Sequence, residues 1–193
     1  MKSNVDMKKK TNFNDFLMLL ENKKKKDEPV NQSNLKSRID YFKSLVASFY
    51  DKLENEWLGE YKDRIIIDSG NCLITEETLG NYEVTTKTLH LGDESVQFIP
   101  VGTVLIGTDA RIDLHYKRKT VMFVHIGDKI NRARDLITIS IDGEKPKKKI
   151  EPGEKVWKFT FRDSRLDYIT ATAESVQELL MSLINEEDKV SFR

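Results

Sequence analysis

The apolar residues between positions 35 and 53 recur in alternating steps of four and three, which is the period of one face of an α-helix. The stripe consists of Leu35, Ile39, Phe42, Val46, Phe49 and Leu53. Ser33 or Asn34 can cap the N-terminus and Gly59 stands near the end, so we predict a long helix over residues 34–58. The same stripe could form a coiled-coil seam, but it spans fewer than three heptads. We therefore expect it to pack on a sheet of its own chain.

Between residues 61 and 170 the pattern changes to short runs rich in β-branched and aromatic residues, separated by Gly, Asn and Asp. In VWKFTF, residues 156–161, aromatic residues alternate with Val156, Lys158 and Thr160, as in a strand with one apolar face. The connections are too short for parallel crossovers. Residues 173–186 carry an apolar face at helical spacing, which predicts a second helix. We predict an α+β fold: a mainly antiparallel, curved, multi-stranded sheet or partial barrel, with the long N-terminal helix packed on one face and a C-terminal helix.

Residues 1–33 are richer in lysine than the rest, so we predict a flexible N-terminal segment followed by one domain over residues 34–190. Within the segment, helical spacing indicates a short amphipathic helix with an apolar face made of Phe13, Phe16, Leu17 and Leu20. Such a short helix is marginal in water unless it docks on something. One hypothesis is that it binds a protein partner as a helix in a groove. The other is that it docks on the sheet of its own chain.

The composition restricts the function classes. Of 193 residues, 38% are hydrophobic and 33% are charged, which is typical of a globular protein rather than a membrane or disordered one. Lys plus Arg equals Asp plus Glu at 32 each, so no net charge favours nucleic acid or an acidic partner. The run FLML is too short to span a bilayer, so we expect no membrane association. The single cysteine, Cys72, excludes an internal disulfide and fits a cytoplasmic protein.

The stretch RIDLHYKRKTVMFVH, residues 111–125, concentrates polar groups that could carry chemistry. If KRK forms the loop of a hairpin, Tyr116 lies opposite Thr120. This register places four polar residues on one face, namely Arg111, Asp113, His115 and His125. One interpretation is a catalytic site in which Asp113 orients a histidine as a general base. The other, which we favour because no nucleophile or second carboxylate stands beside them, is the solvated face of a hairpin.

The remaining motifs are less specific. GTVLIGTD has the glycines of a phosphate loop but lacks its lysine and precedes a strand, so we expect a turn. The three histidines, His90, His115 and His125, show no ligand spacing, and we expect neither a metal nor another cofactor. Basic residues in two loops could contact phosphates, although no aromatic residues are interleaved with them. These candidates are Lys117, Arg118, Lys119, Lys147, Lys148 and Lys149.

Three functional hypotheses follow. The first is a non-enzymatic interaction or accessory module that uses the N-terminal amphipathic peptide and a sheet face to bind a protein partner or a second copy of itself. The second is a nucleic-acid-associated accessory protein that works through the lysine-rich loops. The third is an enzyme with a site made of Asp113, His115 and Arg111, which requires that these side chains line a concave pocket.

Overall fold

The computed structural model describes residues 32–103, 107–132, 135, 153–161 and 167–185. The elements follow one another as helix, sheet and helix. They are α2 (Gln32–Asp51), η1 (Lys52–Trp57), η2 (Gly59–Tyr61), β1 (Ile66–Glu76), β2 (Gly80–Leu91), β3 (Glu94–Gly102), β4 (Arg111–Tyr116), β5 (Lys119–Gly127), β6 (Lys155–Phe161), β7 (Ile169–Thr170) and α3 (Ala173–Ile184). Within these ranges, no helix has the length and apolar character needed to cross a membrane.

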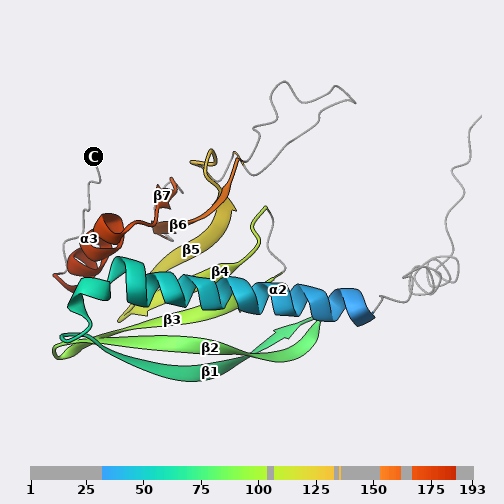
Figure 1. Ribbon diagram of the computed structural model, residues 1–193, viewed down its shortest axis with the longest axis horizontal. Helices are drawn as coiled ribbons and strands as arrows, with labels where there is room; N and C mark the ends of the chain where they lie inside the picture. Colours follow the sequence, from blue (N-terminus) through green and yellow to red (C-terminus); the bar gives the residue numbers. More distant parts are fainter. Residues whose placement is uncertain (1–31, 104–106, 133–134, 136–152, 162–166, 186–193) are drawn as a thin grey trace, which may run out of the picture. The chain divides into compact units, whose positions relative to one another are not determined.

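The strands form one seven-stranded antiparallel sheet in which each strand pairs with its neighbours along the chain, in the order β1 to β7 (Figure 1). The predicted α+β class, the antiparallel sheet and the two flanking helices are therefore confirmed. The partial-barrel alternative is wrong, because the sheet is neither closed nor strongly curled. Closure requires that the first and last strands pair. Here β1 pairs with β2, and β7, which has only two residues, pairs with β6.

The apolar stripe of α2 packs on the sheet of its own chain, as its short length predicted. Phe42, Val46 and Phe49 are all at most 2% exposed. The ring of Phe49 lies 5.7 Å from that of Phe98 on β3 and 4.8 Å from that of Trp157 on β6. The helix predicted over residues 34–58 is observed as two consecutive elements. The α-helix α2 ends at Asp51, and η1 continues it in wider π-helical turns. The stripe thus supplies one wall of the core rather than a coiled-coil seam.

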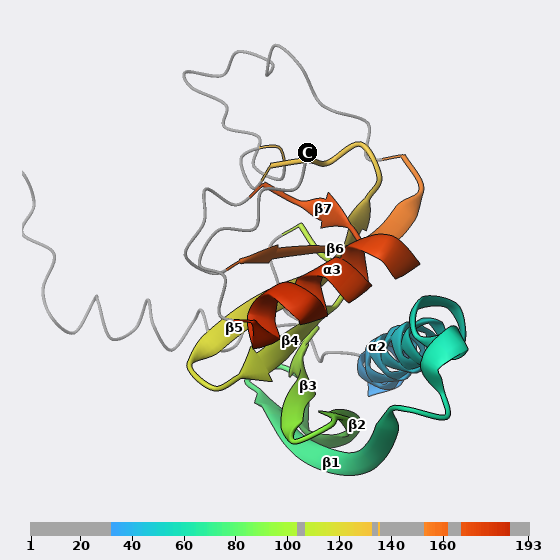
Figure 2. The same ribbon diagram turned by 90° about the vertical axis from the view of Figure 1, so that its left-hand side faces the viewer.

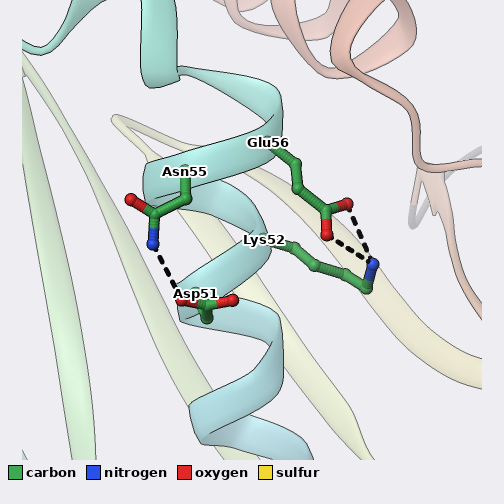
Figure 3. A network of polar contacts seen from close by, with 4 residues as sticks. All are labelled: Asp51, Lys52, Asn55 and Glu56. Atoms are coloured by element: carbon green, nitrogen blue, oxygen red, sulfur yellow. Dashed lines mark hydrogen bonds and ion pairs between the residues drawn. The ribbon is translucent and has the colours of Figure 1, made fainter.

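Where α2 widens into η1, polar side chains four residues apart pair along its outer side (Figure 3). Lys52 Nζ lies 2.9 Å from Glu56 Oε2, and Asn55 Nδ2 donates a hydrogen bond to Asp51 Oδ1 at 2.7 Å. Exposed pairs of this kind contribute about 0.2–0.5 kcal/mol each. They support the end of the helix and do not form a site.

The C-terminal helix α3 closes the same side of the sheet, and Figure 2 shows α2 and α3 together on that side. A capping box begins the helix: Thr172 Oγ1 accepts from Ser175 N at 3.2 Å, and Ser175 Oγ accepts from Thr172 N at 2.9 Å. Gln177 Nε2 donates to Trp57 O at 2.8 Å and so ties α3 to η1. The buried apolar face of α3 consists of Val176, Leu179, Leu180 and Leu183.

The opposite face of the sheet is also partly covered. Val124 and Ile126 of β5 are 5% and 0% exposed. They form a small apolar cluster with Ile130, and Tyr168 packs against it. Val124 pairs with Arg111 and with Lys158, so the face on which these two cations lie carries a second, smaller core.

Candidate functional site

The β4–β5 hairpin has a register one residue away from the predicted one. Tyr116 pairs with Lys119, not with Thr120, and the turn consists of Lys117 and Arg118 alone. Lys117 has a φ of 51°, as the first central residue of a tight hairpin turn requires. A shift of one residue moves every side chain of one strand to the other face. The prediction of a three-residue loop, and the face assignment that followed from it, are wrong.

The corrected register separates His125 from the other three members of the predicted polar cluster. Arg111, Asp113 and His115 remain on one face, opposite Val124, Met122 and Thr120 of β5. His125 shares the other face with Phe123, which pairs with Ile112. The cluster is therefore two groups on two faces of the sheet.

Asp113 is held by Arg111 rather than by a histidine. Arg111 Nε and Nη2 donate to the two carboxylate oxygens of Asp113, both at 2.6 Å, and Asp113 is only 6% exposed. The hydrogen bonds to Asp113 raise the pKa of Arg111 above its ordinary value. His115 Nδ1 lies 3.2 Å from Thr120 Oγ1. A carboxylate in a bidentate pair with guanidinium is a structural ion pair, and nothing in these contacts makes it the orienting group of a general base.

His125 belongs to a different polar group, at the start of β4. Its Nδ1 lies 3.5 Å from Asp109 Oδ2, and its ring centroid lies 5.1 Å from that of Trp157. Lys155 Nζ lies 3.2 Å from the other oxygen of Asp109. Burial lowers the pKa of His125, and Asp109 acts in the opposite direction, so the imidazole is neutral at neutral pH. Asp109 and Lys155 are 46 residues apart, so no local pattern in the sequence connects them.

Lys158 is a buried cation that the sequence placed on a polar face. It is 1% exposed, and its Nζ donates to Asp128 O at 2.7 Å, Ile130 O at 2.8 Å and Asn131 Oδ1 at 3.0 Å. Burial lowers the pKa of Lys158, and Asp128 opposes this shift. Three oxygens satisfy the three donors of an ammonium group. Lys158 therefore fastens the segment after β5 to the second face of the sheet, which is a structural role.

The predicted phosphate contacts do not converge in the described part of the chain. Lys117 Nζ lies 3.3 Å from Glu94 Oε1 and 4.7 Å from the centroid of the Tyr116 ring. Arg118 is in the turn and Lys119 opens β5. Three further candidates, Lys147, Lys148 and Lys149, lie outside the described residues, as do four docking candidates, Phe13, Phe16, Leu17 and Leu20. The described residues contain no group of three His, Cys, Asp or Glu side chains that could hold a metal ion.

A surface cavity of about 520 Å³ lies between α2 and β2. Its lining mixes cations and carboxylates, and Lys87 Nζ lies 2.7 Å from Glu54 Oε1. Tyr50 also lines the cavity, and the proton of its hydroxyl is shared between Thr85 O and Phe98 O, at 3.1 and 3.2 Å. Lys87 and Glu54 are therefore already paired, and a charged ligand would have to compete with this ion pair.

An apolar groove of about 370 Å³ lies between α3 and the turn that precedes β1, and we call it the α3 groove. Met181 stands at its mouth and is 57% exposed. The polar residues of the lining are Gln177 and Asn185. The apolar and aromatic residues are Leu58, Tyr61, Ile65, Leu91, Leu180, Met181 and Ile184. The residues of this groove come from three segments that only the fold brings together, so no sequence pattern indicates it.

Comparisons of the chain with models of protein families, with curated proteins and with solved structures found no match.

Proposed function

We propose that this chain is a non-enzymatic protein-interaction module that binds an amphipathic helix of a protein partner in the α3 groove. The observation that carries the proposal is the groove itself, an apolar depression beside an exposed Met181. Helix-in-groove recognition uses such a depression to take the bulky apolar residues on one face of a partner helix. Methionine suits this use, because its flexible thioether side chain adapts to different partner surfaces.

The lining of the α3 groove favours a protein partner over other ligands. A site for a small molecule combines apolar walls with several convergent polar groups. Here the polar lining is limited to Gln177 and Asn185. A site for nucleic acid needs cations that face phosphates, and the groove lining contains no Lys or Arg. An apolar helix face matches the seven apolar and aromatic residues of this lining.

The enzyme and nucleic-acid hypotheses have weaker support. The Arg111–Asp113 pair is bidentate, and His115 contacts Thr120, so the hairpin residues serve one another. From the sequence, we also propose that the amphipathic segment with Phe13, Phe16, Leu17 and Leu20 is presented to a protein partner. The α3 groove and this N-terminal segment would then both bind protein partners, and neither would take part in a catalytic reaction.

Site-specific photocrosslinking in the cell of origin tests this function. A benzophenone side chain at position 181 should form a discrete adduct with one partner, because this position borders the α3 groove. The matched control carries the same group at position 41, where Tyr41 is similarly exposed, at 53%, but lies on α2. Met181→Glu should abolish copurification of the captured protein, and Met181→Leu should retain it. Equal capture from both positions, or a partner that is indifferent to Met181→Glu, would refute the proposal.

A further inference from the structure

Among the described strands, β1 is terminal in the sheet and is paired on one side only. β1 is eleven residues long and pairs with β2 along its whole length, from Ile66 opposite His90 to Glu76 opposite Gly80. It is the terminal strand of the sheet, and no other described strand pairs with it (Figure 1). The other terminal strand, β7, has only two residues. A long terminal strand presents a row of backbone N–H and C=O groups to which another strand can be added.

Several of the residue types that commonly protect an edge strand are absent from β1. Its sequence, IIDSGNCLITE, contains no proline, lysine or arginine. Two of its apolar side chains face solvent, because Ile66 is 67% exposed and Leu73 is 64% exposed. A strand added at this edge would place new side chains beside Ile66 and Leu73 and remove part of their apolar surface from water.

We propose that β1 pairs antiparallel with β1 of a second copy of this chain, across a two-fold axis centred on Gly70. In this register Ile67 of one copy lies opposite Leu73 of the other, and Ile66 lies opposite Ile74, which is only 7% exposed in its own chain. Each contact occurs twice, as in any two-fold interface. Cross-strand apolar pairs of this kind are the units that stabilise a sheet. The two sheets join into one continuous sheet.

In the neighbouring registers, two carboxylates lie opposite each other or an apolar residue lies opposite a polar one. A centre at Cys72 puts Asp68 opposite Glu76, which sets two carboxylates side by side. A centre at Asn71 puts Asp68 opposite Ile74, and a centre at Ser69 puts Ile67 opposite Asn71. Among these four centres, Gly70 is the one that places two aliphatic pairs opposite each other within the strand, Ile67 with Leu73 and Ile66 with Ile74.

The acidic groups of β1 are compatible with pairing to a second copy. In the Gly70 register, the two Asp68 residues are offset by four positions, or about 14 Å along the strands. That distance exceeds the Debye length of about 8 Å at physiological salt. Asp68 already lies 3.0 Å from His90 Nε2. Glu76 accepts from Tyr82 at 2.9 Å and from the backbone of Thr103 at 2.6 Å, so its charge is held by its own chain.

Cysteine crosslinking of the full chain tests the register. In the double variant Ile67→Cys/Leu73→Cys, made in a Cys72→Ser background, opposed Cα atoms lie roughly 4.5–5.5 Å apart, within disulfide reach. We expect mild oxidation to give a covalent dimer. Each single variant in the same background should give none, because its two copies are offset by about 20 Å. The wild-type chain should not crosslink through Cys72, since a Cys72-centred register is needed for that.

Sedimentation analysis provides the second measurement. The wild-type chain should show concentration-dependent dimers, and Leu73→Lys should be monomeric with an unchanged far-UV circular dichroism spectrum. Met181→Lys, which alters the α3 groove, should still dimerise, so this inference stands or falls separately from the proposed function. A monomeric wild-type chain at every concentration, or crosslinking of the single variants as efficient as that of the double variant, would overturn the proposed dimer.

Discussion

Phe49 is the residue whose removal should most damage the fold. It is 0% exposed and lies at the centre of an aromatic cluster built from several elements. The ring centroids around it lie 4.8–5.7 Å away and belong to Tyr50, Trp57, Phe98, Phe123 and Trp157. Truncation to alanine would leave a cavity lined by side chains whose backbones are anchored in α2, η1, β3, β5 and β6.

The expected loss for Phe49→Ala is large. Buried Phe→Ala substitutions cost about 3–5 kcal/mol, and the cost rises when the surrounding structure cannot collapse into the cavity. Walls from a helix end and three strands cannot all move inward, so we expect about 4–5 kcal/mol. Because domains are typically stable by about 5–15 kcal/mol, the variant should be close to unfolding at room temperature. Phe49→Leu keeps most of the volume and should cost roughly 1–2 kcal/mol.

Equilibrium unfolding in urea, followed by tryptophan fluorescence, measures these losses directly. Both tryptophans of the chain, Trp57 and Trp157, contact Phe49 and will report the transition. Ser48→Ala, on the exposed side of α2, is the control and should change stability by less than about 0.5 kcal/mol. If Phe49→Ala loses less than about 1.5 kcal/mol, the reasoning that places this ring at the centre of the core is refuted.

Three further predictions test other parts of the structure. Lys158→Met should destabilise the protein by about 2–4 kcal/mol, because it leaves buried carbonyl oxygens without donors. Amide hydrogen exchange over residues 128–132 should then accelerate, and unchanged exchange would argue against the anchoring role of Lys158. The pKa of His125 is lowered in the folded state, so the unfolded chain takes up a proton more readily. The free energy of unfolding should therefore fall as the pH drops below 6.5, the ordinary value for histidine, and His125→Gln should flatten this dependence. A wild-type stability that stays constant between about pH 7.5 and about pH 5.5 would contradict the sign of that shift. Thr172→Ala removes the N-cap of α3 and should cost about 1 kcal/mol in urea unfolding, whereas a neutral result would show that the cap is dispensable.

Local patterns determined the elements and the class of the fold. The alternating spacing from Phe42 to Leu53 predicted the face of α2 that packs, because the helical period by itself decides which residues share a side. Short connections predicted an antiparallel sheet, since a parallel crossover needs more chain than they contain. Neither inference required knowledge of any contact between distant residues.

Tertiary structure decided the register of the β4–β5 hairpin, the burial of Lys158, and the two surfaces proposed for binding, the α3 groove and the edge of β1. The hairpin register depended on the backbone of Lys117, whose positive φ made a two-residue turn and moved His125 to the other face. Lys158 looked solvated in an alternating strand, but its oxygen partners lie 27 to 30 residues earlier in the chain. The α3 groove joins residues from three segments, and β1 is a terminal strand only because of the strand order. Sequence periodicity is a local property, whereas these features depend on which distant segments the fold brings into contact.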